Sequence, residues 1–194
     1  DALLLLDYFV GNVTFCDVQK NAADVNRNGC IDLNDALKIL DYCVNGCWSL
    51  SKSAPLSGNI FIGKMIHKAN GEFKLPVNAV NLTGANAISV SIDFKHQAVD
   101  SIAYENAVKD GWMVVSNKKD GKFLIAMIGL NELQTQTLGT LIFNITSKFA
   151  IPFSTEIRIN EEEILKYEID FMKELPSEFS LSQNYPNPFN PVTT

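Results

Sequence analysis

The stretch ADVNRNGCIDLNDALKILDYCVNG, residues 23–46, constrains the fold more than any other part of the chain. Within it, twelve residues place an oxygen donor at each of positions 1, 3, 5, 7, 9 and 12, the ligand spacing of calcium loops. These donors are Asp24, Asn26, Asn28, the backbone carbonyl of Cys30, Asp32 and Asp35. Gly29 stands at position 6, where the chain must turn sharply. A ligand set made only of hard oxygens predicts Ca²⁺ rather than a soft metal, and the alternative is an Asn/Asp-rich surface turn.

A helix is expected directly after this loop, because apolar residues recur there at helical spacing. They are Ala36, Leu37, Ile39, Leu40, Cys43 and Val44. Residues 18–23, ahead of the loop, are few and polar, so no helix is predicted there. Position 12 is Asp35 where an EF-hand has glutamate. The sequence therefore predicts a loop–helix unit rather than a helix–loop–helix.

The same unit returns, cut short, at the start of the chain. Residues 1–11 (DALLLLDYFVG) align with residues 35–46 (DALKILDYCVNG) at an offset of 34, with seven of the first ten positions identical. Internal repetition at such a period indicates two copies of one supersecondary unit. Asp1 then corresponds to Asp35, the last ligand of a calcium loop whose other residues precede the sequence.

Residues 1–47 resemble a type I dockerin, a small module of two calcium loop–helix repeats that binds a cohesin. The resemblance implies contact with the partner through positions of the second loop and of both helices. Carried onto this chain, those positions are Leu33, Asn34, Leu40 and Asp41, with Leu6 and Asp7 equivalent to the last two. The hydroxyl residues that the family carries at the first two positions are absent. The alternative for both Leu6 and Leu40 is a place in the core at helical spacing.

All four cysteines lie in the first quarter of the chain, at Cys16, Cys30, Cys43 and Cys47. An even number crowded into a small segment predicts disulfides formed in an oxidising compartment. Three pairings are possible, and the sequence does not choose among them. A zinc site is disfavoured, because the spacing contains no Cys-x-x-Cys pair and no histidine lies nearby.

Beyond a polar linker at residues 48–56, the hydrophobic period changes from helical to alternating. Strands are expected at 59–66, 72–80, 87–94, 112–117, 122–129 and 139–146, with the last one or two within 156–171. Turn signals separate them, such as Ala-Asn-Gly at 69–71 and Lys-Asp-Gly at 119–121. About eight strands in this length indicate an all-β sandwich of the jelly-roll type. The predicted fold class is thus a small α-helical calcium module followed by a β-sandwich.

The order of strand types across residues 57–171 resembles a cohesin. The resemblance is carried by FKLPVNAVNLTG (73–84), ISVSIDF (88–94), GWMVVSN (111–117), KFLIAMIG (122–129) and GTLIFNIT (139–146). A carbohydrate-binding module is the main alternative for this domain. Such modules use an exposed aromatic platform, and Trp112 is the single tryptophan of the segment.

The tail FSLSQNYPNPFNPVTT, residues 179–194, resembles the opening of the C-terminal sorting domain of the type IX secretion system. Its prolines and asparagines form an extended segment without a core of its own. Residues 172–194 are read as a linker and the start of that domain, and the chain as a piece of a longer protein. The resemblance implies a protein exported to the cell surface or the extracellular space.

Composition narrows the function. A net charge of −6 argues against a nucleic-acid partner, and no apolar run approaches the length of a membrane span. No catalytic constellation is recognisable, and the two histidines, His67 and His96, are isolated. We therefore expect a secreted, non-catalytic protein for calcium-dependent docking, with a carbohydrate-binding accessory module or a structural spacer as alternatives. The partner is expected to be a cohesin or dockerin module or another copy of the chain.

That expectation extends to assembly. The flexible stretch WSLSKSA, residues 48–54 of this linker, is about seven residues long and reaches about 25 Å at most, which disfavours docking of the helices on their own sandwich. Head-to-tail contacts between copies would instead produce extracellular filaments or rings.

Overall fold

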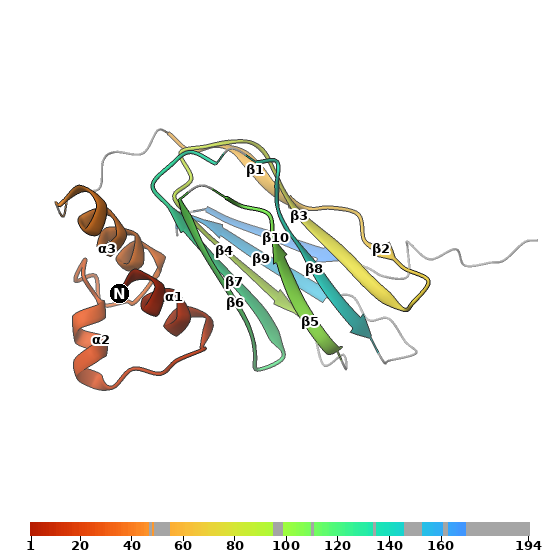
Figure 1. Cartoon of the computed structure of the whole chain (residues 1–194), viewed down its shortest axis with the longest axis horizontal. Coiled ribbons are helices and arrows are strands. Elements are labelled where there is room, and N and C mark those ends of the chain that lie inside the picture. The colour runs from red at the N-terminus through yellow and green to blue at the C-terminus, as the bar shows by residue number, and fades with distance from the viewer. Residues whose placement is uncertain are drawn as a thin grey trace, which may run out of the picture.

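The chain folds into three helices followed by two antiparallel sheets in a computed structural model (Figure 1). The structure describes residues 1–46, 48, 55–94, 99–109, 111–133, 135–145, 153–160 and 163–169. The helices are α1 (Ala2–Val10), α2 (Asp17–Ala23) and α3 (Leu33–Asn45). The strands are β1 (Ser57–Ile62), β2 (Ile66–His67), β3 (Glu72–Thr83), β4 (Ala87–Asp93), β5 (Val99–Asn106), β6 (Trp112–Lys119), β7 (Lys122–Gly129), β8 (Thr137–Ile145), β9 (Phe153–Ile159) and β10 (Glu163–Ile169).

The two sheets form a β-sandwich. Sheet A has the order β1-β3-β8-β5, with β2 paired to β3, and sheet B has the order β10-β9-β4-β7-β6. One core cluster of buried residues lies between them, with Phe94, Phe143 and Phe153 among its largest side chains. Strand β9 shows how alternate residues face this core. Its residues Phe153, Thr155, Ile157 and Ile159 are buried, while the residues between them are partly exposed. The two-sheet sandwich predicted from the period-two pattern is confirmed.

Two strands of sheet B are buried on both faces. Along β7, every residue from Ile125 to Gly129 is buried, and the first four residues of β4 are buried as well. A strand covered on both sides is expected to carry a nearly continuous apolar run, as β7 does in KFLIAMIG. The sandwich core covers one face, and the helices cover the other.

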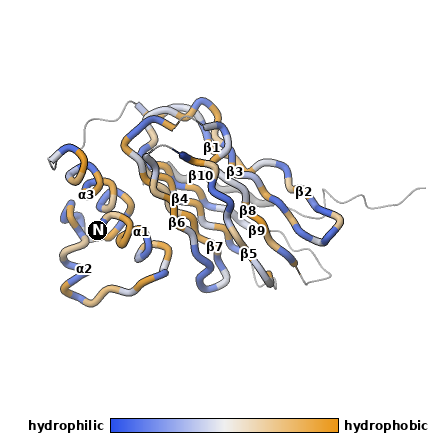
Figure 2. The backbone as a smooth tube through the Cα atoms, viewed as in Figure 1, coloured by the Kyte–Doolittle hydropathy of each residue, from blue (hydrophilic) through white to orange (hydrophobic). Residues whose placement is uncertain are grey.

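The helices form a second hydrophobic cluster with the outer face of sheet B. This cluster joins Leu5, Leu6 and Val10 of α1, and Ala36, Leu37 and Leu40 of α3, to Ala87 of β4 and to Ala126 and Ile128 of β7. Helix α1 lies on β6 and β7, and α3 lies on β7 and β4. Figure 2 shows apolar segments of the helices facing apolar segments of these strands. We call this contact the helix–sheet interface.

This interface corrects the expectation that the linker keeps the helices off their own sandwich. Residues 46–56 separate Asn45, the last residue of α3, from Ser57, the first of β1. Eleven residues reach about 36–40 Å when extended, whereas seven residues reach about 25 Å. The connection is therefore long enough for docking within one chain.

The expected loop–helix unit and the expected set of strands also need correction. Helix α2 precedes the calcium-loop sequence, so the unit is helix–loop–helix. Its N-terminus is held by a capping box between Cys16 and Gln19, which offsets the lack of an apolar stripe. Strand β5 was not expected, because half of the residues in its sequence VDSIAYEN are polar, as suits its place at the edge of sheet A.

The predicted disulfides are also absent among the described cysteines. Cys16, Cys30 and Cys43 are free and exposed. They lie on three different elements: the start of α2, the loop after it, and the last turns of α3. Cys47 lies outside the described residues, as do most of the linker and the tail at 172–194, including the stretch similar to a sorting domain.

The helix–sheet interface predicts the effect of a cavity. Ile128→Ala should lower the free energy of unfolding by about 2–5 kcal/mol, because Ile128 is fully buried under the helices. Val80→Ala is the matched control on sheet A, since Val80 is 46% exposed and its truncation should change stability by less than about 0.5 kcal/mol. Urea denaturation measures both. Equal effects of the two substitutions would contradict the interface.

Candidate functional site

The candidate calcium loop connects α2 to α3. Asp24 is the C-cap of α2, and Asp32 is the N-cap of α3, where its carboxylate accepts a hydrogen bond from the Asn34 N–H at 2.8 Å. Between them the chain takes a left-handed conformation at Arg27 (φ 56°) and at Gly29 (φ 86°). No atom lies near the position of a Cβ at Gly29, so its backbone conformation, rather than crowding, favours glycine there.

Two carboxylates hold the loop from opposite ends. Asp24 accepts hydrogen bonds from the N–H groups of Asn28 (3.0 Å) and Gly29 (2.9 Å). Asp35, in the first turn of α3, accepts from the N–H groups of Asn26 (3.0 Å) and Asp32 (3.0 Å). Residues nine positions apart are thereby tied together, and the predicted ligands share one short loop.

The two asparagines of the loop also turn their oxygen atoms toward its backbone. The Asn26 Oδ1 atom accepts from the Asn28 N–H at 2.9 Å, and the Asn28 Oδ1 atom accepts from the Cys30 N–H at 2.8 Å. The Asn28 side-chain amide lies 3.5 Å from the Asp32 Oδ2 atom. Five predicted ligands thus make contacts with one another or with the backbone between them. Asp1 is not among them, because it caps the separate helix α1.

The loop carries a net negative charge, because it contains three aspartates and one arginine, Arg27. Burial raises the pKa of the Asp35 carboxyl, and the nearby charges of Asp32 and Asp24 raise it further, against the lowering effect of the two backbone hydrogen bonds. No lysine or arginine of the described residues forms an ion pair with these three aspartates. A cation bound in the loop would remove this repulsion.

The chemistry of the donors fits calcium only if neutral oxygens take part. Across the described ranges, no group of three or more His, Cys, Asp or Glu side chains is arranged to hold a metal ion. The loop combines its aspartates with the amide oxygens of Asn26 and Asn28 and with the carbonyl of Cys30. Such mixed oxygen sets are usual for Ca²⁺, which accepts carbonyl and amide ligands beside carboxylates.

The predicted partner-binding residues lie mostly inside the protein. Leu6, Leu33 and Leu40 are buried and belong to the cluster of the helix–sheet interface, and Asp41 is buried as well. Asn34 and Asp7 are half-buried. In this arrangement the leucines serve the contact with sheet B of the same chain.

The two repeats bury equivalent positions in the cluster of the helix–sheet interface. Leu6 and Leu40, related by the offset of 34, are both buried in the interface cluster. The aspartate after each leucine accepts a side-chain hydrogen bond from an asparagine at the end of its helix, Asn12 to Asp7 at 2.8 Å and Asn45 to Asp41 at 2.6 Å. The sequence repeat is therefore also a structural repeat.

Polar contacts at the end of α1 complete the interface, and sequence reasoning missed them. The Asn117 side-chain amide donates to the Val10 carbonyl at 3.3 Å. Gly11, in the left-handed conformation (φ 85°), lies so close to Lys119 that a Cβ there would come 2.5 Å from the lysine Cδ atom. Asn117 and Lys119 look like ordinary solvent-facing residues of an edge strand, so the sequence carries no signal for them.

The aromatic platform of a carbohydrate-binding module is not provided by Trp112. Its ring is half-buried against the sandwich core, and its Nε1–H donates to the Asn131 carbonyl at 3.1 Å. None of the described helices is long and apolar enough to cross a membrane.

No family model matches the chain, and no curated protein matches it. Several solved structures share similarity with it. A cohesin module from a Clostridium perfringens family 33 glycoside hydrolase is 16% identical, over 59% of this chain and 96% of that module, with a TM-score of 0.38. A non-cellulosomal cohesin from the archaeon Archaeoglobus fulgidus is 11% identical, over 50% and 67%, with a TM-score of 0.36. The chitin-binding domain of a Pyrococcus furiosus chitinase is 17% identical, over 57% and 100%, with a TM-score of 0.37. At TM-scores this low, these likenesses assign the chain to neither class.

The glycines that end α1 and α3 predict a loss of stability set by backbone conformation. Both Gly11 and Gly46 have positive φ, so Gly11→Ala and Gly46→Ala should each lower the free energy of unfolding by about 1–2 kcal/mol. The Lys119 atoms beside Gly11 are the end of a flexible, exposed side chain that can move aside. In a double-mutant cycle followed by urea denaturation, Lys119→Ala should therefore recover less than about 0.5 kcal/mol in either variant. A larger recovery in Gly11→Ala alone would show that Lys119 is held in place beside the helix end.

Proposed function

We propose that the chain is a non-catalytic extracellular assembly protein whose calcium-dependent helical module docks on the outer face of sheet B. The observation that carries this proposal is the burial of equivalent leucines from both repeats in the hydrophobic cluster that joins α1 and α3 to the outer face of sheet B. Residues 1–47 are the module that docks, and residues 57–171 are the domain that receives it, as the resemblances to dockerin and cohesin imply. The resemblance of residues 179–194 to a sorting domain supports a location outside the cell.

In this proposal, calcium binds the loop through Asp24, Asn26, Asn28, Asp32, Asp35 and the Cys30 carbonyl. The ion supplies positive charge where three carboxylates repel one another. Asp35 stands in the first turn of α3, so the ligands are continuous with the helix that carries Leu37 and Leu40 into the interface. Calcium thereby fixes the start of α3 and, through it, the surface presented to the sheet.

The same surfaces serve assembly between molecules. An interface that is complementary within one chain is equally complementary between two copies, because the module of one copy meets an identical sheet on the other. Exchange of modules yields closed rings where the rotation closes, and open filaments where it does not. A separate cohesin or dockerin module with matching surfaces would compete for the same face.

Calcium binding gives the first test of this proposal. Titration calorimetry should show calcium binding to the intact chain, and calcium at one hundred times its dissociation constant should add about 2.7 kcal/mol to the free energy of unfolding. Asp24→Ala should abolish both effects, because it removes a carboxylate that reaches across the loop. Asp17→Ala is the control, since its side chain is 97% exposed in α2 and lies outside the ligand set. Undetectable heat of binding in the unmodified chain would end the assignment.

Docking is tested by cutting the connection between the modules. A protease site placed within residues 49–54 and cleaved after folding should leave two fragments that elute together in calcium and separately in chelator. Ile128→Asp should separate them under both conditions, because a charge would be buried beneath the helices. Val80→Asp on sheet A should behave as the unmodified protein. Fragments that separate even in calcium would show that the contact does not act as a docking interface.

A further inference from the structure

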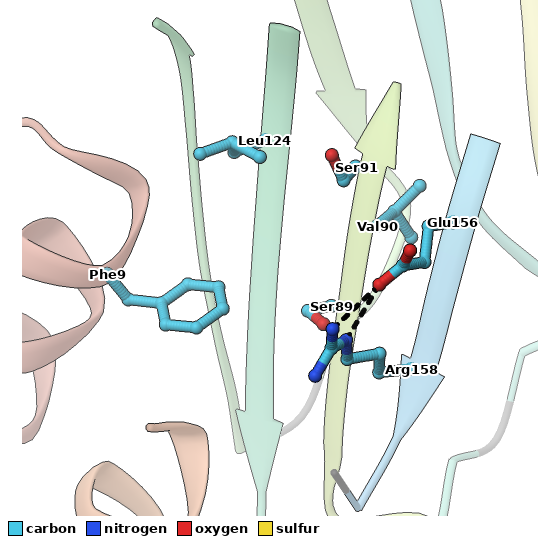
Figure 3. Close-up of a pocket in the computed structure, with 7 residues that line it drawn as sticks. All are labelled: Phe9, Ser89, Val90, Ser91, Leu124, Glu156 and Arg158. Atoms are coloured by element: carbon cyan, nitrogen blue, oxygen red, sulfur yellow. Dashed lines mark hydrogen bonds and ion pairs between the residues drawn. The ribbon is translucent and has the colours of Figure 1, made fainter. Parts of the chain in front are cut away.

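A groove runs along the outer face of sheet B beside the helix–sheet interface (Figure 3). It has a volume of about 320 Å³ and is lined by Phe9 of α1, Ser89, Val90 and Ser91 of β4, Leu124 of β7, and Glu156 and Arg158 of β9. In Figure 3 the Phe9 ring points from α1 toward β7, and the serines and the charged pair lie beyond that strand. Two parts of the chain that are far apart in sequence thus form one cavity.

We propose that this groove binds a neutral saccharide. Its walls differ in the way such a ligand requires, with Phe9 and Leu124 on one side and polar side chains on the other. A sugar ring presents C–H groups on its faces and hydroxyl groups around its edge. The apolar wall would cover the C–H groups, and the polar side chains would meet the hydroxyl groups.

The hydrogen-bonding groups of the groove suit hydroxyl groups in particular. The hydroxyls of Ser89 and Ser91 make no hydrogen bond to any described residue, and each can donate and accept. Beside them, a carboxylate acceptor and a guanidinium donor stand together in Glu156 and Arg158. A hydroxyl group also donates and accepts, so a saccharide can use both kinds of partner at once.

Charge argues for a neutral ligand. The Arg158 Nη2 atom lies 2.8 Å from the Glu156 Oε1 atom, and the Arg158 Nε–H donates to the same oxygen at 2.9 Å. The two charges cancel, and every other residue that lines the groove is uncharged. Their side chains remain 43% and 35% exposed, so a ligand in the groove would replace water at this pair. A phosphate or a strongly charged peptide would find no net charge to balance its own.

The backbone argues against an extended peptide. Strand β4, which forms the floor, is paired with β7 on one side and with β9 on the other. Its N–H and C=O groups are therefore used within the sheet, and a peptide cannot add to it as a further strand. Only side chains are offered to the ligand.

Because Phe9 belongs to α1, the groove is complete only while the helices are docked. A saccharide that contacts both Phe9 and β4 stabilises the docked arrangement by mass action. Binding of this ligand and the position of the helices are thus linked, whatever the role of calcium. This linkage does not rest on the proposed assembly function.

The test uses the intact chain on an array of neutral oligosaccharides built from hexoses and N-acetylhexosamines, followed by calorimetry with the pentasaccharide that binds best. Phe9→Leu, which keeps an apolar side chain but loses the ring, and Ser91→Ala, which removes one hydroxyl, should each weaken binding about three- to tenfold. Ser154→Ala is the control, because it removes a hydroxyl from a partly exposed position of β9 outside the groove and should change binding less than about twofold. Melting temperatures without ligand show that each variant is folded.

Three results would overturn the proposal. The first is the absence of binding to every neutral oligosaccharide at millimolar concentration. The second is binding that Phe9→Leu and Ser91→Ala leave unchanged, which would place the ligand elsewhere. The third is binding of uncharged decapeptides, tested in parallel, that is lost in the same two variants while the oligosaccharides fail to bind.

Discussion

The burial of two helices on the outer face of sheet B is the contact on which the rest of this structure depends. A sandwich alone would leave Ala126 and Ile128 open to water on the face away from its core, and the helices alone would expose the apolar residues of α1 and α3 that face this sheet. The helices and sheet B each have an apolar face, and each face is removed from water by contact with the other. Because hydrophobic stabilisation grows with the apolar area removed from water, the two parts are more stable together than either is alone.

In the proposed function, the loop between α2 and α3 makes this contact depend on calcium. Its buried Asp35 sits at the start of the helix that packs on β4 and β7, beside two further carboxylates. Negative charge at a helix N-terminus is favourable through the helix dipole, but three carboxylates within one loop repel one another. The balance between these effects changes when a cation enters the loop. Under the proposed function, calcium in this loop would thereby act on the docking surface beside it.

Most elements that were predicted correctly from the sequence were located by the periodicity of apolar residues. The spacing of apolar residues located α3, and the alternation or continuity of apolar residues located β3, β4 and β7 near their observed bounds. The misses have physical causes. Helix α2 depends on capping and has no apolar stripe, and in β5 the alternation of Ile102 and Tyr104 with exposed residues is short and preceded by an irregular register. The groove was not predictable, because Phe9 and Arg158 are distant in sequence and are brought together by docking of the helices.

If the proposed assembly takes place, docking within one chain also sets its conditions. A short tether holds the helices near their own sheet at an effective concentration on the order of millimolar. Another copy competes for that sheet only where its own concentration approaches this value, as it does when molecules are crowded on one surface. Contact within the chain is therefore favoured in dilute solution, and exchange between chains is favoured at high local density. The same eleven residues that permit self-docking thus make assembly depend on crowding rather than on a separate binding surface.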